Sequence, residues 1–271
     1  MTKHMPNFLC IGAMRAGSTL LYDLLKSHPD IYVPPYRKEV RYFDQNYDRG
    51  QSWYESFFEG ADRQLVGEVT PTYLYSDEAR HRIKEDIPDV KLLVILRDPV
   101  KRAYSNFKHA YLKKNTETES FKDFLEKRPD VWQRGQYYHY LNKWFEVFGK
   151  DAFCVLFLED IDRASLKRLA QHLDVDEEGF DASVLTSSSH SSFVPISQSL
   201  YSAFNNAGKW LRKKGMDEVV ETLRPVLDTI LASDKDFPAL QDSDRRQLQA
   251  YYKQDVEALE TLLGRNLPFW L

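Results

Sequence analysis

The sequence predicts an α/β fold with a central, mainly parallel sheet flanked by helices, and a helical C-terminal part. Its short apolar runs are continuous rather than alternating, which is typical of strands buried on both faces of a sheet. Helical patterns separate these runs, so strand and helix alternate along the chain with right-handed crossovers. The predicted strands are Phe8–Ile11, Leu65–Val69, Leu92–Leu96 and Phe153–Phe157, with Ile31–Val33 as a weaker candidate.

The helices between the strands follow from apolar spacing and from signals at their ends. Asp98-Pro99 supplies an N-cap and a proline at the first helical position, and this helix should run through about Lys113. A further apolar stripe over 137–148 is ended by Gly149. Four leucines recur at helical spacing after the first strand: Leu20, Leu21, Leu24 and Leu25.

The C-terminal part has helical patterns and no strand signal from Leu200 onward. The aromatic residues of 267–271 are expected to dock on the body of the protein. The segment 186–192, TSSSHSS, is predicted to be a loop that is too short to separate domains. We therefore predict one domain over 1–271. The closing helix is predicted from an apolar stripe of Leu248, Tyr251, Val256, Leu259, Leu262 and Leu263.

Composition excludes several classes of protein. Of the 271 residues, 42% are apolar and 29% charged, which argues against a disordered or collagen-like chain. The formal charge of −4 gives no general attraction for nucleic acid, so an anion-binding site has to be local. The apolar runs are too short for a transmembrane segment. Cys10 and Cys154 lie in apolar runs and are predicted to be buried free thiols, which, with no signal-peptide pattern, favours a cytoplasmic protein.

A glycine-bounded turn, Gly12-Ala-Met-Arg-Ala-Gly-Ser-Thr19, joins the first strand to the first helix. Such a turn points several backbone N–H groups at one place, and the helix dipole adds partial positive charge there. The spacing matches the P-loop, except that Ser18 stands where a lysine would reach the β- and γ-phosphates of a nucleoside triphosphate. The cation in this turn is Arg15. The turn predicts a phosphate site, with a purely structural turn as the alternative.

A second anion site is predicted where the strand over 92–96 ends. Arg97 leaves the carboxyl edge of this strand, where open α/β sheets bind ligands, and a helix begins at once. Its guanidinium suits a bidentate contact with a second phosphate, and Ser105, two turns into the helix, can donate to the same group. A salt bridge between Arg97 and Asp98 or another acid is the alternative.

Together these stretches resemble the sulfotransferases that use 3′-phosphoadenosine 5′-phosphosulfate (PAPS), most closely the bacterial and heparan-type branch. The likeness spans nearly the whole chain and is carried by GAMRAGSTLLYDLLKSHPDI, RKEVRYFD, GEVTPTYL, RGQYYHYLNKWFEVFG, VLFLEDI and VEALETLLGRNLPFW. The resemblance implies an O-sulfotransferase that moves the sulfuryl group of PAPS to an acceptor hydroxyl by in-line displacement. PAPS is the expected co-substrate, and because it has no β/γ-phosphate pair to bridge, no metal is expected.

The resemblance also implies roles for particular residues. Arg15 falls on the catalytic cation beside the 5′-phosphosulfate, and Glu39 on the general base that takes the acceptor proton. For Glu39 the alternative is an ion pair with Arg37, Lys38 or Arg41. The residues expected to bind the donor are Arg15, Ala16, Gly17, Ser18 and Thr19 at the 5′ end, and Arg97 and Ser105 at the 3′-phosphate.

Four positions depart from the family pattern. Val69 stands where heparan-type members commonly carry a lysine, so one cation near the sulfuryl group is missing. Arg41 replaces a frequent histidine and Tyr42 a frequent phenylalanine, which affects the expected acceptor preference. Ile196 stands where related bacterial sequences often have a basic residue.

Several other residues could have either a structural or a functional role. Glu68 and Tyr73 flank the end of a strand and are expected to contact the acceptor, with packing as the alternative. His28 is expected to be a capping or loop residue. His109 and His190 are alternative bases.

Two other functions remain open at this point. A P-loop kinase or nucleotidase is disfavoured by the absent lysine, and a non-catalytic nucleotide-binding module would not need Glu39. The acceptor is expected to be a small alcohol, a lipid, an acyl chain on a carrier protein or a saccharide.

Overall fold

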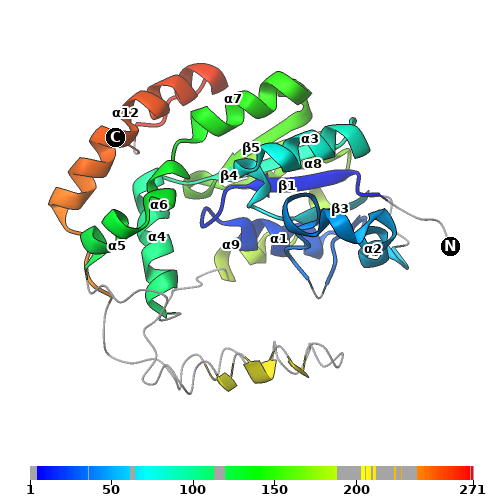
Figure 1. Cartoon of the computed structure of the whole chain (residues 1–271). Helices are drawn as coiled ribbons and strands as arrows, with labels where there is room; N and C mark the ends of the chain where they lie inside the picture. Colours follow the sequence, from blue (N-terminus) through cyan, green and yellow to red (C-terminus); the bar gives the residue numbers. More distant parts are fainter. Residues whose placement is uncertain are drawn as a thin grey trace. The chain divides into compact units, whose positions relative to one another are not determined.

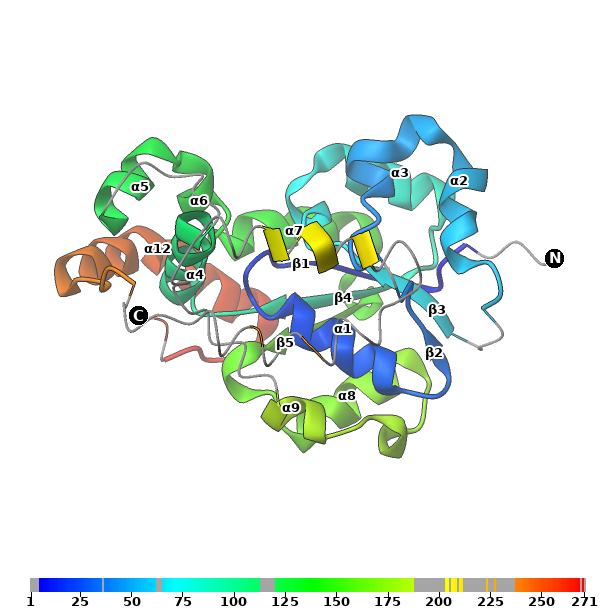
Figure 2. The ribbon, with the colours of Figure 1, turned by 90° about the horizontal axis from the view of Figure 1, so that it is seen from below.

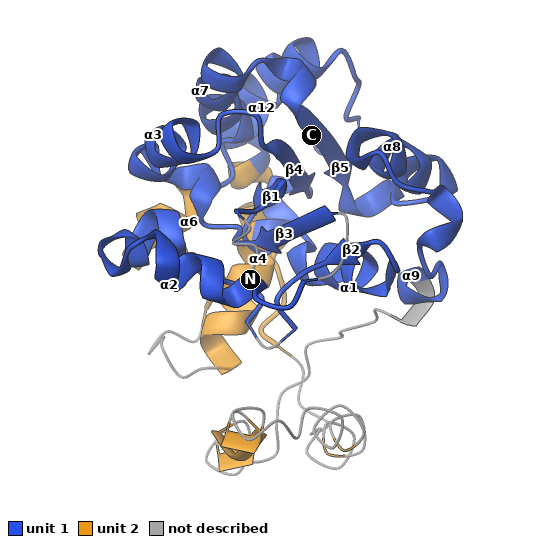
Figure 3. Ribbon diagram, turned by 90° about the vertical axis from the view of Figure 1, so that its right-hand side faces the viewer, with its two compact units in different colours: residues 1–102, 134–189, 249–271 blue, residues 103–133, 190–248 orange. Residues whose placement is uncertain are grey.

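The computed structural model describes residues 5–35, 37–61, 65–112, 120–187, 203–204, 206–208, 210–211, 223, 227, 237–268 and 270. The chain forms two compact units, drawn in different colours in Figure 3. One consists of residues 1–102, 134–189 and 249–271, and the other of 103–133 and 190–248. The assignment of 1–271 to one domain stays a prediction.

The first unit contains a five-stranded sheet in the order β2-β3-β1-β4-β5 (Figure 2). All of its neighbouring strands pair in parallel, so their carboxyl ends lie at one edge. The predicted strands are confirmed to within one residue at each end, and the weaker candidate forms the short edge strand β2. The strands are β1 (Phe8–Gly12), β2 (Ile31–Tyr32), β3 (Leu65–Val69), β4 (Lys91–Leu96) and β5 (Phe153–Phe157).

Helices cover both faces of this sheet, which confirms the α/β class. On one face lie α1 (Ser18–Ser27), α8 (Arg163–Leu173) and α9 (Ser183–Ser187), which are seen from below in Figure 2. On the other face lie α3 (Asp77–Asp86) and α7 (Tyr137–Phe148) (Figure 1). The short helix α2 (Gln51–Glu55) precedes β3. The α7 helix ends at Gly149 with a φ of 79°, as its sequence predicts.

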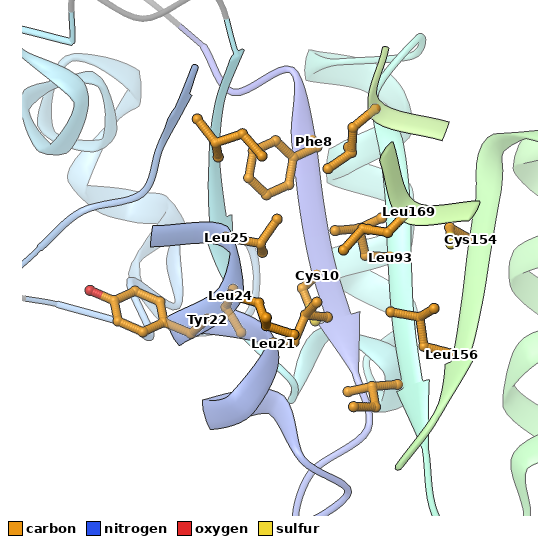
Figure 4. Close-up of a cluster of buried hydrophobic side chains, with 14 of the residues drawn as sticks. Phe8, Cys10, Leu21, Tyr22, Leu24, Leu25, Leu93, Cys154, Leu156 and Leu169 are labelled. Carbon is orange, nitrogen blue, oxygen red and sulfur yellow. The ribbon is translucent and has the colours of Figure 1, made fainter. Parts of the chain in front are cut away.

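The core between the sheet and the α1–α8 layer is apolar and close-packed (Figure 4). Cys10, Leu93 and Leu156 point into it from β1, β4 and β5, and leucines of α1 and α8 close it. Cys10 and Cys154 are buried free thiols, as predicted. Burying one leucine in this way contributes about 1.5–3 kcal/mol. The leucines therefore fix α1 on the sheet and anchor the turn that precedes it.

The α4 helix (Pro99–Leu112) begins at the predicted cap, and the predicted end at Lys113 lies outside the described residues. Asp98 Oδ1 accepts the N–H groups of Val100 at 2.8 Å and Lys101 at 3.2 Å. In the second unit, α4 is followed by α5 (Phe121–Lys127) and α6 (Pro129–Gln133). There the ring of Phe107 lies 5.5 Å from Phe121, between centroids.

The closing helix is confirmed as α12 (Asp242–Leu263). Within the first unit it holds the start of α7, because the Asp255 carboxylate accepts the N–H groups of Tyr138 at 3.0 Å and His139 at 3.1 Å. Burial raises the pKa of Asp255 to about 6. As expected, Trp270 docks on the body, with its ring 5.7 Å from that of Tyr137. None of the helices in the described part of the chain is both long and apolar enough to cross a membrane.

The loop expected over 186–192 is corrected at its start, since Thr186 and Ser187 belong to α9. The Asp181 side chain accepts the Ser183 N–H at 2.9 Å and so begins this helix, and Leu185 packs on the core. The rest of that loop, and most of the helical region expected from Leu200 onward, lie outside the described residues.

Candidate active site

The turn between β1 and α1 forms a cradle of backbone groups. The Ala13 N–H donates to the Ile95 carbonyl at 2.8 Å, which ties the turn to β4. Gly17 precedes α1 with a φ of 104°, and a Cβ atom there would lie 2.7 Å from the Leu158 side chain. Arg15 also has a positive φ, 67°, which is uncommon for a residue with a side chain. Such backbone conformations concentrate at ligand-binding turns.

The first turn of α1 adds donors to the cradle. The Leu21 N–H bonds to the Gly17 carbonyl at 3.1 Å, and the N–H groups of Ser18 and Thr19 precede this bond. By helix geometry they point out of the N-terminus, where the macrodipole adds about half a positive elementary charge. The predicted residues from Arg15 to Thr19 thus lie together in an arrangement that suits a phosphate.

Positive charge is concentrated around this cradle. Arg15 is half-buried, and burial together with the neighbouring guanidinium of Arg97 lowers its pKa. Glu39 raises the pKa of Arg15, and Arg102, in the first turn of α4, lowers it. Cations brought together in this way repel one another, and a bound polyanion relieves that repulsion.

Lys38 is a cation at the cradle that the sequence analysis did not place there. Its Nζ lies 2.9 Å from Thr19 Oγ1 and 3.1 Å from Ser18 Oγ. Burial lowers the pKa of this half-buried lysine, and the nearby Glu39 raises it. From the sequence, Lys38 is expected only as an alternative partner of Glu39. The signal in the sequence that could have found Lys38 is Ser18, which stands in the place of the P-loop lysine. Because that lysine is missing, a positive charge at this position of the cradle has to come from another segment of the chain.

Glu39 is exposed and lies beside the cations of the cradle. Its carboxylate acts electrostatically on both Arg15 and Lys38. Of its alternative partners, Arg41 pairs with Asp44 at 2.8 Å, and Arg37 donates from Nε to the backbone carbonyl of Glu39 at 3.4 Å. An exposed carboxylate in this position can be reached by an acceptor hydroxyl, as a general base requires.

A buried carboxylate, Glu68, holds the segment that carries Lys38 and Glu39. Its Oε1 accepts hydroxyl hydrogen bonds from Tyr54 at 2.7 Å and Tyr73 at 2.8 Å. Its Oε2 accepts from the Thr70 hydroxyl at 2.6 Å and from the Val40 N–H at 3.2 Å. Burial raises the pKa of Glu68, and these four donors oppose the rise by stabilising the carboxylate.

The hydroxyl groups around Glu68 extend this network along the segment. The Thr70 hydroxyl accepts the Arg41 N–H at 3.4 Å, and the Tyr73 hydroxyl accepts the Phe43 N–H at 3.3 Å. Both Glu68 and Tyr73 are fully buried and bond to each other, which favours the packing alternative. A contact of Glu68 or Tyr73 with the acceptor stays a prediction.

The end of β4 carries the predicted second anion site. Arg97 is half-buried, and its backbone carbonyl accepts the Tyr137 hydroxyl at 2.8 Å. Asp98, the alternative partner of Arg97, instead caps α4 and accepts from Val100. Ser105 lies in the part of α4 that belongs to the second unit.

His28 is a structural residue, as expected. It is fully buried at the end of α1, where its Nδ1 accepts the Asp30 N–H at 3.1 Å. The proton therefore lies on Nε2, which donates to the Asp176 carbonyl at 2.8 Å. Of the alternative bases, His109 lies in the second unit, and His190 is outside the described residues.

The positions that depart from the family pattern are placed as follows. Val69 is fully buried in the core, so it supplies no group to the cradle. Arg41 has a positive φ of 59°, and Tyr42 is buried and stacks on Tyr54 with ring centroids 4.3 Å apart. Ile196 is outside the described residues.

Comparison with known proteins identifies the family. The family model described as a sulfotransferase domain matches residues 5–255. The chain belongs to the sulfotransferase family. The family implied by the sequence resemblance is thereby confirmed.

The chain has curated relatives that are longer than itself. Human heparan sulfate glucosamine 3-O-sulfotransferase 3B1 is 35% identical over 131 residues, which cover 48% of this chain and 30% of the relative. The membrane-associated sulfotransferase kil1 of Dictyostelium discoideum is 35% identical over 136 residues, covering 47% of this chain and 29% of that one. The bifunctional heparan sulfate N-deacetylase/N-sulfotransferase 1 of Caenorhabditis elegans is 26% identical over 99% of this chain and 31% of the relative. The chain thus spans about a third or less of these relatives.

Solved structures share the fold of this chain. The sulfotransferase from Alicyclobacillus acidocaldarius superimposes with a TM-score of 0.69 at 24% identity, over 98% of this chain and 99% of that chain. The sulfotransferase domain from the curacin biosynthetic pathway superimposes with a TM-score of 0.51 at 13% identity, over 98% and 100% of the two chains.

Proposed function

We propose that this sulfotransferase transfers the sulfuryl group of PAPS to an acceptor hydroxyl. The observation that carries the proposal is the set of cations around the N-terminus of α1. Arg15 lies in the turn, Lys38 contacts the first two residues of the helix, and Arg97 acts electrostatically on Arg15. A donor with a 5′-phosphosulfate and a separate 3′-phosphate is the kind of polyanion that suits such a site.

The proposed reaction is an in-line displacement at sulfur. The acceptor oxygen forms a bond to sulfur while the bond from sulfur to the bridging oxygen of the 5′-phosphate breaks, as in phosphoryl transfer. Arg15 and the N–H groups of Ser18 and Thr19 stabilise the negative charge that develops on the leaving phosphate. Glu39 takes the proton of the acceptor hydroxyl. The products are the sulfated acceptor and adenosine 3′,5′-bisphosphate (PAP).

The second anion site, at the end of β4, is proposed to distinguish PAPS from nucleotides that have no 3′-phosphate. Arg97 is proposed to bind the 3′-phosphate with its planar guanidinium. The role expected of Ser105 from the sequence stays a prediction. No residue is proposed to hold a metal, because PAPS has no β- and γ-phosphates that need to be bridged.

The acceptor is proposed to be a hydroxyl compound, with a saccharide favoured over a small alcohol, a lipid or a carrier-bound acyl chain. The support for a saccharide is the heparan sulfate named for relatives that align with this chain. The exposed position of Glu39 is compatible with acceptors of any size.

Calorimetric titration with PAP, adenosine 5′-phosphate and ATP with magnesium tests the donor site. PAP should bind most tightly. Arg97→Ala should weaken PAP by about 10- to 100-fold, the value of a hydrogen-bonded charge pair, and should leave adenosine 5′-phosphate nearly unchanged. Arg163→Ala removes an exposed arginine from the start of α8 and is the matched control. Tighter binding of ATP with magnesium than of PAP would favour a kinase or nucleotidase instead.

Incubation with PAPS labelled in the sulfuryl group tests the transfer itself. Label should pass to a fraction of an extract of the source cells, and the labelled compound identifies the acceptor. Tight PAP binding without transfer to any fraction would support a non-catalytic nucleotide-binding module.

A further inference from the structure

Lys38 lies at the first turn of α1, beside the groups that form the cradle. Its Nζ contacts Thr19 Oγ1 at 2.9 Å and Ser18 Oγ at 3.1 Å. These two residues also contribute the N–H groups that point out of the helix end. The ammonium group and the backbone donors therefore lie at the same helix end.

The hydroxyl groups can transmit the charge of Lys38 to a bound anion. An ammonium group only donates, so Ser18 and Thr19 accept from Lys38 and keep their own O–H protons for another acceptor. An oxygen of a phosphate or sulfuryl group in the cradle is such an acceptor. The ammonium group has three N–H bonds and the two hydroxyls use two of them, which leaves one for the anion itself.

The surroundings of Lys38 contain groups of both charges. Lysine usually keeps its ammonium group in water, whereas here the side chain is half-buried and burial lowers its pKa. Glu39 opposes this by raising the pKa, and Arg15 lowers it because the two cations repel each other. A bound anion would stabilise the ammonium group of Lys38 in this half-buried position.

The segment that carries Lys38 is held in place from β3. The Val40 N–H bonds to Glu68 at 3.2 Å, and the Arg41 N–H bonds to Thr70 at 3.4 Å. These bonds lie two and three residues from Lys38 and restrict where its backbone can lie. The position of the lysine is thus built into the fold.

We propose that Lys38 is a second catalytic cation, which contacts the bound donor where the 5′-phosphate joins the sulfuryl group. This inference rests on the proposed function and adds to it the residue that supplies the charge missing at Ser18 and Val69. As the bond from sulfur to the bridging oxygen breaks, the ammonium group of Lys38 stabilises the charge that develops on the leaving phosphate. Lys38 stays protonated throughout, and the acceptor proton still goes to Glu39.

The test uses Lys38→Met, which removes the charge and keeps the length of the side chain. The variant should bind PAP about 10- to 100-fold more weakly than the unchanged protein, because a charge-assisted contact with the 5′-phosphate is lost. Adenosine 3′-phosphate, which has no 5′-phosphate, should bind the two proteins equally. Transfer of labelled sulfuryl from saturating PAPS should slow by roughly 10²-fold or more.

Three further variants complete the design. Lys26→Met removes an exposed lysine from the last turn of α1 and should change neither binding nor transfer. Lys38→Arg keeps the charge and should recover most of the PAP affinity, which a purely structural defect would not allow. If thermal unfolding shows that Lys38→Met is not folded, Lys38→Gln takes its place with the same expected losses.

The binding and transfer measurements can overturn the role of Lys38 without overturning the proposed function. Failure of the unchanged protein to bind PAP would overturn the proposed function, and the role of Lys38 with it. Normal PAP binding by the unchanged protein, with equal affinity and transfer in Lys38→Met, would overturn the role of Lys38 alone. An equal loss for PAP and adenosine 3′-phosphate would also contradict it, because the effect would then not depend on the 5′-phosphate.

Discussion

The two sides of the candidate site are built in different ways. The donor cradle over 12–19 is formed by consecutive residues, and its support is the buried face of α1. The segment over 38–43 is held by hydrogen bonds to residues of 54–73 that are distant in the sequence, with Glu68 at their centre. The cradle is therefore encoded locally, and the segment with the proposed base depends on a buried carboxylate elsewhere in the chain.

Glu39→Gln gives the largest expected effect and tests the chemical role of the segment. The change keeps the shape and removes the base, so turnover at saturating PAPS should fall by roughly 10²- to 10⁴-fold. PAP affinity and thermal stability should stay nearly unchanged, because the carboxylate is exposed. Transfer of labelled sulfuryl is the measurement, and Glu59→Gln, another exposed glutamate, is the control. Normal turnover would contradict the role of Glu39 as the base.

Arg15→Ala tests the cradle in the same assay. Turnover should fall by on the order of 10²-fold or more, since one donor to the developing charge is lost. The core should be unaffected, so the far-ultraviolet circular dichroism and the midpoint of thermal unfolding should match those of the Arg163→Ala control. Retained turnover at saturating PAPS would mean that the charge is stabilised by other groups.

Asp255 is a half-buried carboxylate that, like Glu68, holds a segment distant in the sequence, and its titration should affect the stability of the protein. Its native pKa of about 6 lies above the ordinary value of 3.8, so between these values the folded protein keeps a proton that the unfolded chain releases. The free energy of unfolding should therefore fall as pH rises from about 4 to about 6, by at most about 3 kcal/mol, and this contribution should be constant above that range. Urea unfolding across this range is the measurement. Asp255→Asn should flatten the dependence, and Asp151→Asn, at an exposed position, should not.

Glu68→Gln makes the same chemical change as Glu39→Gln, but at a buried carboxylate instead of an exposed one. The amide cannot accept all four hydrogen bonds, so the free energy of unfolding should fall by about 1–3 kcal/mol. PAP affinity should change less than stability, because the cradle is supported by α1. Urea unfolding at neutral pH and PAP titration are the two measurements. A large loss of PAP affinity without a loss of stability would contradict the separation of the two sides.

The sequence predicts the cradle well and the segment poorly, for a physical reason. The turn from Gly12 to Thr19 is readable because glycine spacing, strand and helix lie next to each other in the chain. The role of Glu68 is not readable in this way: its position near the end of a strand suggested an acceptor contact, and only the folded structure brings Tyr54, Tyr73 and Val40 around it. The contact of Lys38 with Ser18 and Thr19 joins residues about twenty positions apart, and no local pattern encodes it.

The packing of α1 also bears on how such a protein can be re-engineered. Leu21 and Leu24 are fully buried. Because a close-packed core resists displacement, the cradle at the start of α1 is held rigidly in place. The neighbouring stretch from Arg37 to Phe57 is also anchored by buried residues, Val40, Tyr42, Phe43 and Tyr54, but it has exposed positions between them. Substitutions at these exposed positions leave the core unchanged. Under the proposed function, a library of such substitutions would vary acceptor selectivity while donor recognition is retained.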